Sequence, residues 1–348
     1  MKYRMPAEWE PHEATWIAWP HNKEDWPGKF GPVPWIYADI VRCLVPGERV
    51  EILVNNAAAE AEARSMLQLT GVQLANVRFH LWPTDRVWLR DSGPIFVRDA
   101  ETRSLLVTDW RFNAWAKYEN WQRDDQIPAN VAELLQMQRH EPMIRGQRVV
   151  LEGGSIDTNG AGVLLTTEEC LLSAEQQRNP GVSREELEEC FAEFLGIEKT
   201  IWLGKGIVGD DTHGHVDDIA RFAAPNIIVT AMEQNPQDEN YAALNDNLAR
   251  LRAARNLAGE PFEIVTLPMP APVIFEDQRL PASYANFYIA NQAVLVPVFS
   301  DPKDRVALNT LQSLFPDREV IGIPCRDFIW GLGALHCMTQ QQPASAPA

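Results

Sequence analysis

The chain has 348 residues, of which 45% are hydrophobic and 23% charged, a composition that is ordinary for a folded globular protein. Its net charge of −17 argues against a nucleic-acid partner, because phosphate contacts need a basic face, and it mildly favours a cationic ligand. Five cysteines without a C-x-x-C pair favour a reduced, cytoplasmic protein over a disulfide scaffold. No apolar run is long enough for a membrane helix and the N-terminus shows no signal-peptide pattern, so we expect no membrane partner and no secretion.

The N-terminal third alternates predicted strands and helices. An apolar strand is expected at residues 14–19, followed by a loop broken by Pro and Gly. Pro34 at a first helical turn predicts a helix to about Leu44. A strand at residues 49–55, a helix at 57–69 stopped by Gly71, and a strand at 77–82 follow.

Four pairs of apolar strands around short polar turns then recur at intervals of roughly 60 to 70 residues. They are expected at residues 94–110, 154–166, 218–232 and 284–299. An amphipathic helix and one more strand follow each pair. The helices are expected at residues 128–139, 183–195, 239–257 and 304–314, and the strands at 148–151, 200–203, 263–267 and 320–323.

This repetition predicts the fold. The unit of strand, strand, helix and strand occurs four times, and a C-terminal strand at residues 335–339 can join the N-terminal strand to close a fifth unit. The predicted fold is therefore a five-bladed α/β propeller of ββαβ units, a closed ring that leaves no sheet edge exposed. Residues 1–340 are expected to form one catalytic domain, and residues 341–348 a disordered tail.

A chemically reactive residue precedes several of the predicted strand pairs. The stretch GDDTHGHVDD combines two of the seven histidines with four acidic residues, and WLRDSGP, LEGGS and GALHC hold equivalent positions in other units. Equivalent positions meet near the axis of a closed ring, and flanking glycines allow close approach there. We therefore expect the following residues to converge: Asp91, Glu152, His215, Asp217 and Cys337.

Such a set suits substitution at a guanidinium carbon. Two carboxylates, Asp91 and Asp217, match the paired N–H donors of a guanidinium. Cys337 is a nucleophile when a nearby cation lowers its pKa, His215 is the acid and base, and Glu152 orients or tunes that histidine. The thiolate would attack, His215 would protonate the departing ammonia, and water would then release a urea product.

Plainer interpretations of the same residues stay open. A single cysteine such as Cys337 is most often buried and inert, and Arg90 with Asp91 could form an ordinary surface ion pair. Glu152, which precedes two glycines, could simply belong to a turn. Convergence of the whole set is what favours a catalytic site.

A metal site is the other interpretation of the histidines. His213, His215 and Asp217 alternate, so they could share one face of a strand as ligands. The remaining Cys and His have no ligand-like spacing, so we expect no metal and assign His213 a structural or supporting role. His336 is next to Cys337 and would point to the opposite face of a strand, so it is not expected to be the base.

Several motifs in order resemble the agmatine deiminase and bacterial peptidyl-arginine deiminase family of guanidine-modifying enzymes. They are MPAEWEPHEATWIAWP, WLRDSGPIFV, RFNAWAKYENWQRDD, VVLEGGSID, DDTHGHVDDIARF and LHCMTQQ, and together they span nearly the whole chain. The resemblance implies a five-bladed α/β propeller. It also implies that Cys337 carries the covalent intermediate, that His215 is the acid and base, and that Glu152 supports His215. The residues that it implies for substrate binding are Asp91, Asp217, Trp88 in the pocket wall and, as a further acidic candidate, Asp211.

Two stretches depart from the family pattern. The family commonly has Gly-Gly-Gly-Asn before the terminal His-Cys, where this chain has Gly331-Leu332-Gly333-Ala334. It also commonly has Asn where His213 stands. Both stretches flank the nucleophile or the base, so they bear on pocket shape and substrate preference more than on the type of reaction.

Residues and resemblance together predict a cytoplasmic agmatine deiminase that converts agmatine and water to N-carbamoylputrescine and ammonia without a metal or organic cofactor. A deiminase of peptidyl or free arginine would use the same chemistry, and free arginine would need a cation for its carboxylate, such as Arg90, Arg111 or Arg123. An amidinotransferase and a non-catalytic guanidine- or polyamine-binding protein are alternatives from other classes. The resemblance also implies a homodimer or larger assembly.

Overall fold

The structure is a computed structural model that describes residues 2–345. Within this range the strands form five sheets of three or four strands and two small hairpins. In hydrogen-bonded order the sheets are β1 (Tyr3–Arg4), β5 (Ile95–Asp99), β6 (Leu105–Thr108), β7 (Arg139–His140); β10 (Asp157–Thr158), β11 (Val163–Thr167), β12 (Lys199–Leu203); β13 (Ala220–Ala224), β14 (Ile227–Met232), β15 (Glu263–Pro268); β18 (Tyr288–Ile289), β19 (Ala293–Val298), β20 (Glu319–Pro324); and β21 (Gln340–Pro343), β2 (His12–Ala18), β3 (Arg49–Leu53), β4 (Val77–His80). The hairpins are β8 (Met143–Ile144) with β9 (Gln147–Arg148), and β16 (Ile274–Phe275) with β17 (Gln278–Arg279).

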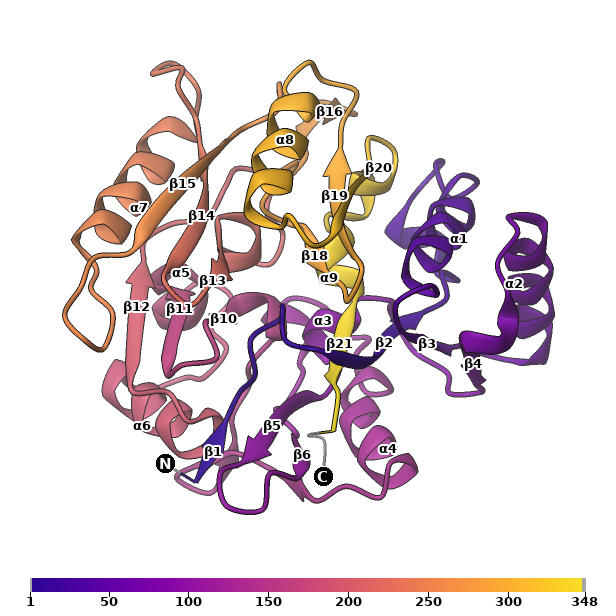
Figure 1. Ribbon diagram of the computed structural model, residues 1–348, viewed down its shortest axis with the longest axis horizontal. Helices are drawn as coiled ribbons and strands as arrows, with labels where there is room; N and C mark the ends of the chain where they lie inside the picture. The colour runs from indigo at the N-terminus through magenta and orange to yellow at the C-terminus, as the bar shows by residue number, and fades with distance from the viewer. Residues whose placement is uncertain (1, 346–348) are drawn as a thin grey trace.

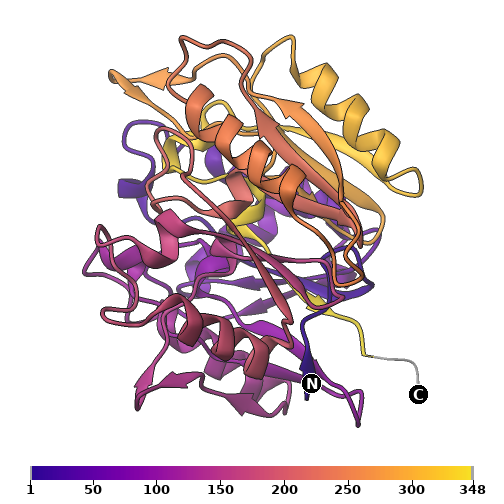
Figure 2. The same ribbon diagram turned by 90° about the vertical axis from the view of Figure 1, so that its left-hand side faces the viewer.

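The longer helices lie outside the sheets, whereas two short ones lie near the middle of the molecule. The helices are α1 (Val33–Leu44), α2 (Ala57–Leu69), α3 (Leu89–Ser92), α4 (Ile127–Leu134), α5 (Glu168–Leu172), α6 (Arg184–Leu195), α7 (Tyr241–Ala253), α8 (Asp304–Leu314) and α9 (Leu335–Met338). Figure 1 shows α1, α4, α6, α7 and α8 around the periphery and α3 and α9 near the centre. In Figure 2 the orange α7 and the magenta α6 face the viewer with their strands behind them. Within the described chain, no helix combines the length and apolar character needed to cross a membrane.

Each of the five large sheets contains an antiparallel pair with a parallel neighbour. β5 and β6 are antiparallel and β6 and β7 parallel, and the same holds for β10–β12, β13–β15 and β18–β20. In the remaining sheet, β21 is antiparallel to β2, and β2 is parallel to β3. A helix separates the two parallel strands in sequence, as a parallel connection requires. The predicted order of two strands, a helix and a third strand therefore recurs.

Local signals placed some helices accurately. The predicted capping box begins α6: the Ser183 hydroxyl accepts from the Glu186 N–H at 3.2 Å, and the Glu186 carboxylate accepts from the Ser183 N–H at 2.9 Å. Gly196, in the left-handed region with a φ of 71°, ends the helix. Helix α8 spans the predicted residues 304–314.

Two predictions about the C-terminus are wrong. Residues 335–338 form the helical turn α9 instead of a strand, and β21, which pairs with β2, lies partly in the predicted tail. The glutamines of β21 are buried because each has a polar partner. Gln340 donates to the Pro94 carbonyl at 2.6 Å, and Gln342 accepts from Trp16 Nε1 at 3.0 Å. The last predicted tail residues, 346–348, lie outside the described range.

The unit that contains α4 also differs from the prediction. The helix ends at Leu134 rather than residue 139, and Gln136 follows in the left-handed region with a φ of 53°. The third strand of this sheet is consequently β7, which comes before the predicted strand at 148–151. Residues 153–155, predicted to begin a strand, form a 3₁₀ turn instead. That turn belongs to the site described next.

Candidate active site

Four short helical turns carry the residues that the sequence predicted to converge. Asp91 lies on α3 and Cys337 on α9. Glu152 directly precedes the 3₁₀ turn at 153–155, and His215 precedes a second 3₁₀ turn, at 216–218, which contains Asp217. Helix α3 packs against α9 and against the 153–155 turn, which in turn packs against the 216–218 turn. The structure therefore brings the five residues together.

Gly154 determines how closely these turns approach one another. A Cβ atom at this position would lie 2.6 Å from His215 Nδ1, 2.8 Å from Asp91 Oδ1 and 3.0 Å from Asp217 Oδ2. Distances this short are repulsive, so only glycine fits. Its backbone N–H donates to Asp91 Oδ1 at 3.0 Å and helps to hold that carboxylate.

Asp91 is buried and is fixed by donors on both oxygens. Besides the Gly154 N–H, Trp115 Nε1 donates to Asp91 Oδ2 at 2.9 Å. Trp115 adopts the left-handed region with a φ of 59°, which is unusual for a bulky residue and indicates that its placement is enforced. Burial raises the pKa of Asp91 to about 6, although the neighbouring His215 opposes the rise.

The two oxygens of Asp217 have different surroundings. Oδ2 lies 2.7 Å from His336 Nδ1 and accepts from the Cys337 thiol at 3.6 Å. Oδ1 is buried and has no hydrogen-bond partner within residues 2–345. Burial alone would raise the pKa of Asp217, but the hydrogen bond and charge of His336, with the charge of His215, hold it below its usual range.

His215 lies between two carboxylates without a hydrogen bond to either. Its Nδ1 is 3.7 Å from Asp91 Oδ1, and its Nε2 is 3.9 Å from Glu152 Oε2. Neither ring nitrogen has a hydrogen-bond partner in the described chain. Burial lowers the pKa of His215, but Asp91, Cys170 and Glu152 outweigh burial and raise it well above its usual value. The ring is therefore charged and free to donate a proton.

Glu152 is anchored from the side opposite His215. Its Oε1 accepts from Arg178 Nε at 2.9 Å, and both side chains are fully buried. Burial opposes ionisation, but the charges of Arg178 and His215 lower the pKa of Glu152 to about 2. Glu152 is thus a permanent carboxylate beside the histidine.

Cys337 lies among hydrogen-bond donors and carboxylates. Asn286 Nδ2 donates to its sulfur at 3.1 Å and also to Asp218 Oδ1 at 3.0 Å. Burial, followed by the charges of Asp217, Asp218 and Asp91, raises the pKa of the thiol well above its usual value. Without a bound cation, Cys337 is therefore a neutral thiol.

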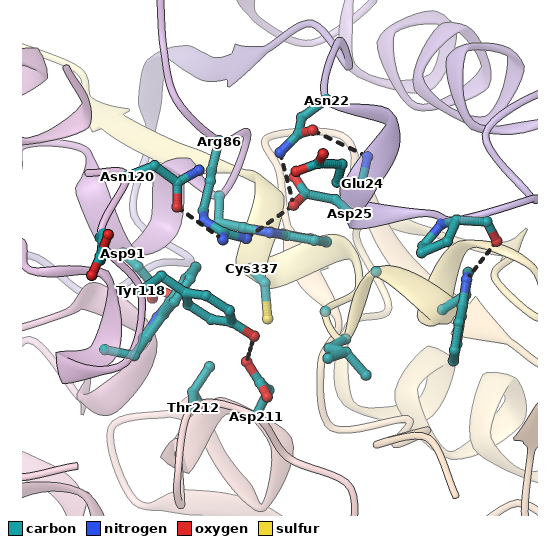
Figure 3. Close-up of a pocket in the computed structure, with 18 of the residues that line it drawn as sticks. Asn22, Glu24, Asp25, Arg86, Asp91, Tyr118, Asn120, Asp211, Thr212 and Cys337 are labelled. Carbon is teal, nitrogen blue, oxygen red and sulfur yellow. Dashed lines mark hydrogen bonds and ion pairs between the residues drawn. The ribbon is translucent and has the colours of Figure 1, made fainter. Parts of the chain in front are cut away.

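A cavity of about 650 Å³ opens onto the sulfur of Cys337. Trp88 and Asp91 line it as well. Figure 3 shows the sulfur between two polar pairs: Arg86 with Asp25 on one side, and Tyr118 with Asp211 on the other. The sulfur of Cys337 is thus accessible from a cleft with an acidic rim.

The cavity accounts for the departure from the family pattern before Cys337. A Cβ atom on Gly333 would lie 2.7 Å from the Trp88 ring, and one on Gly331 would lie 2.5 Å from the Trp26 ring. Gly331 and Gly333 therefore lie where an indole ring packs directly against the backbone, which leaves no room for a side chain. Between them, Leu332 lines the cavity in the left-handed region with a φ of 66°. The departure places a bulky apolar side chain in the wall.

Asp211, the further acidic candidate, also lines the cavity, but its charge is already paired. Its Oδ2 accepts from the Tyr118 hydroxyl at 2.7 Å, and its Oδ1 pairs with Lys117 Nζ. A substrate cation would have to share these partners. Asp211 therefore lies at the site without being an open anionic contact.

The alternating set His213, His215 and Asp217 does not assemble as a metal site. The His213 ring contacts Ser173 Oγ at 3.2 Å, away from the other two residues. In the part of the chain that the structure describes, the group that could hold a metal is Glu152, Cys170 and His215, whose donor atoms lie within 4.8 Å of one another. Glu152 already has an ionic partner in Arg178, so this group needs no metal for charge balance.

Sequence reasoning missed several residues of the site. Asn286 occupies, just before β18, the position that reactive residues occupy in other units, so the repeat itself could have identified it. Trp115 lies inside a resembling motif but carried no assigned role. Cys170 and Arg178 come from α5 and the loop after it, for which the sequence offered no signal. His336 was set aside because a strand was expected where α9 forms.

The whole chain matches proteins of one family. Residues 4–343 match the family model described as Porphyromonas-type peptidyl-arginine deiminase. An agmatine deiminase from Pseudomonas aeruginosa is 35% identical, over 99% of this chain and 97% of its own length. Solved agmatine deiminases from Enterococcus faecalis and from C. jejuni, the latter with substrate bound, superpose with TM-scores of 0.90 and 0.87 at 30% and 28% identity, covering 99% of this chain and 97% of theirs. Sequence, fold and site geometry thus agree that the chain belongs to the Porphyromonas-type peptidyl-arginine deiminase family.

Proposed function

We propose that this protein is an agmatine deiminase, a C–N hydrolase that converts agmatine and water to N-carbamoylputrescine and ammonia through a covalent intermediate on Cys337. The observation that carries the proposal is that the thiol of Cys337 and the carboxylate of Asp91 line one cavity. Behind them, His215 is buried 3.7 Å from Asp91, and Asp217 is buried 3.6 Å from the sulfur of Cys337. The carboxylates of Asp91 and Asp217 suit the paired N–H groups of a guanidinium. Relatives named agmatine deiminase along the full chain support this substrate.

Substrate binding activates the nucleophile in this proposal. Negative charge around Cys337 keeps the free enzyme in the thiol form, and a guanidinium between Asp91 and Asp217 offsets that charge. The thiol then releases its proton to water in the cavity that Cys337 lines, and the thiolate attacks the central guanidinium carbon to form a C–S bond.

His215 then transfers protons in both half-reactions. Its charged ring donates a proton to the departing nitrogen, the C–N bond breaks, ammonia leaves, and an amidino-thioether remains on Cys337. The neutral imidazole next takes a proton from water as the water oxygen bonds to the same carbon. The C–S bond then breaks as the hydroxyl proton passes to the leaving sulfur, so the ureido product leaves and the Cys337 thiol is regenerated. Glu152, held by Arg178, stabilises the charged form of His215.

Peptidyl or free arginine is the alternative substrate. The arginines expected to bind a free carboxylate do not line the cavity in the described chain: Arg90, Arg111 and Arg123. Arg86 does line it, but it already donates to Asp25 at 2.9 Å and to Asn120 at 3.2 Å. A cavity whose arginine is already engaged favours agmatine, which has an ammonium and no carboxylate.

The wider setting is proposed on the same basis. We propose that the five large sheets close as a five-bladed α/β propeller around the site, which the pairing of β21 with β2 supports by joining the two ends of the chain. We also propose that the enzyme works in the cytoplasm, without a metal or organic cofactor, as a homodimer or larger assembly.

The test is a ureido-product assay on purified protein with agmatine, free arginine and a blocked arginyl peptide side by side, in EDTA. Product from agmatine alone is expected. If arginine or the peptide were preferred, the proposed reaction would stand but its substrate would be arginine or peptidyl-arginine. If none of the three gave product, the proposal would be contradicted. Adding amine acceptors tests the amidinotransferase alternative. A transferase would pass the amidino group to the amine, so its product would differ when an amine is present.

A further inference from the structure

We propose that His336 is a positioning residue that, held by Glu8, orients the carboxylate of Asp217 toward the substrate. The inference rests on the proposed function only in taking a guanidinium as the ligand. Sequence reasoning placed His336 on the far face of a strand, away from the chemistry. Helix α9 instead turns its ring into the buried space between two carboxylates.

Both ring nitrogens of His336 contact carboxylate oxygens. Nδ1 lies 2.7 Å from Asp217 Oδ2, and Nε2 lies 2.8 Å from Glu8 Oε2. Neighbouring charges hold the pKa of each of these acids below its usual range although both are buried, so both are ionised at neutral pH. An ionised carboxylate can only accept hydrogen bonds, so the bond that holds Asp217 is donated by a ring N–H of His336.

Glu8 is itself fixed by three other donors. Arg221 Nη2 lies 2.9 Å and Arg90 Nη2 3.2 Å from Glu8 Oε2, and the backbone N–H of Ile289 donates to Glu8 Oε1 at 2.8 Å. The carboxylate therefore cannot rotate away from His336 without losing several bonds. An anchor of this kind restricts the ring in turn.

The histidine determines which oxygen of Asp217 is left unpaired. The oxygen that His336 binds, Oδ2, is also the oxygen that accepts from the Cys337 thiol at 3.6 Å. That engagement leaves Oδ1 buried and without a partner in the described chain, available to a guanidinium N–H. Without the ring of His336, the carboxylate could rotate and its two oxygens would exchange roles.

The backbone of His336 is held separately from its ring. Its N–H donates to Asn286 Oδ1 at 2.9 Å, and its carbonyl accepts from Arg90 Nε at 3.3 Å. These bonds do not depend on the side chain. A His336→Gln change therefore removes the imidazole ring, while the backbone bonds on either side of it stay.

The experiment compares two alkylating agents on Cys337. The cationic 2-chloroacetamidine needs an oriented Asp217 to bind its amidinium, whereas neutral iodoacetamide does not. The ratio of their inactivation rates thus reports the orientation of Asp217. Because neither reaction requires turnover of a substrate, the ratio can be measured even if agmatine is not the substrate. In His336→Gln the ratio is expected to fall roughly tenfold or more, the effect of losing one charge-assisted hydrogen bond. Glu8→Gln should lower it in the same direction.

The matched control is His80→Gln. His80 also pairs with a carboxylate, with Nε2 2.7 Å from Glu51 Oε2, but its ring packs on Trp16 and Trp82. The ratio of the two inactivation rates in His80→Gln should equal that of the wild type. A wild-type ratio in folded His336→Gln and Glu8→Gln would overturn the inference.

A measurement on the unmodified protein covers the case in which the variants do not fold. Nitrogen-15 spectra of the wild type should show a proton on Nδ1 of His336, the nitrogen that contacts Asp217. An unprotonated Nδ1 would overturn the inference as well.

Discussion

Asp91 and Asp217 have opposite pKa shifts although both are buried beside Cys337. The pKa of Asp91 is raised to about 6, whereas that of Asp217 is lowered by the hydrogen bond and charge of His336 despite its burial. The difference comes from their partners: Asp91 accepts from Trp115 and from the Gly154 N–H, whereas Asp217 is held by His336. A cationic ligand would therefore find one carboxylate ionised in advance and would complete the ionisation of the other.

Neutralising either carboxylate should weaken substrate binding. In a Cys337→Ala background, where turnover is abolished but agmatine should still bind, Asp217→Asn or Asp91→Asn is expected to cost about 1.5 to 3 kcal/mol of binding free energy, or roughly 10- to 150-fold in Kd. The reason is that a buried guanidinium loses a charged hydrogen-bond partner. Isothermal titration calorimetry with agmatine measures this loss of binding free energy. Unchanged affinity in both variants would remove these residues from the guanidinium site, and ureido product from Cys337→Ala would rule out the covalent mechanism.

The reactivity of Cys337 should depend steeply on pH. Burial and the nearby carboxylates raise its pKa well above the ordinary value of 9.0, so the neutral thiol is favoured below the raised pKa. The rate of iodoacetamide labelling should therefore rise about tenfold per pH unit and still be rising past pH 9. Guanidinium ion should shift this curve to lower pH, because a bound cation favours the thiolate. Cys337→Ala supplies the background from the other cysteines, and fast labelling at neutral pH without a cation would contradict the expectation.

Among the structural elements, the short turns before the strands determine the geometry of the site. Gly154→Ala should reduce kcat/KM by about 100-fold, because displacing catalytic groups by about 1 Å has effects of that size. The added Cβ would lie 2.6 Å from His215 Nδ1 and 2.8 Å from Asp91 Oδ1, so at least one of them must move. Gly31→Ala is the control, since its Cβ would have no heavy atom within 4 Å. Near wild-type kinetics in Gly154→Ala would show that the turns are not tightly packed.

Prediction from sequence succeeded where a local pattern determines the element. The capping box of α6 and the apolar period of α8 are local signals, and both helices form at the predicted positions. It failed for β21, because a run of Gln resembles a tail until its side chains find buried partners. The error at α9 then removed His336 from consideration.

The residues of the site likewise divide into those that a local pattern identifies and those that it does not. Asp91, Glu152, His215, Asp217 and Cys337 lie within motifs, so the sequence could identify them. Arg178, by contrast, lies outside these motifs and acts only through its contact with Glu152, on another segment. Such contacts follow from the tertiary arrangement, which no short stretch of sequence contains.

At the scale of the whole molecule, the two ends of the chain meet beside the catalytic residues. β21 pairs with β2, and Gln341 Oε1 accepts from Arg90 Nη1 at 2.6 Å. Truncation after Thr339 should therefore abolish activity and lower the melting temperature, because it removes a buried strand and a partner of a buried charge. A chain ending at Ser345 is the control and should keep both its activity and its melting temperature. Full activity of the shorter chain would show that β21 is dispensable.

This arrangement has a consequence for synthesis on the ribosome. β21 is translated long after β2, because nearly all the other described elements lie between them. At about 5 to 20 residues per second, the nascent chain spends tens of seconds with one edge of β2 unpaired. The proposed active site is therefore incomplete until β21 has been made, and during that interval the open edge of β2 is exposed to pairing with other chains.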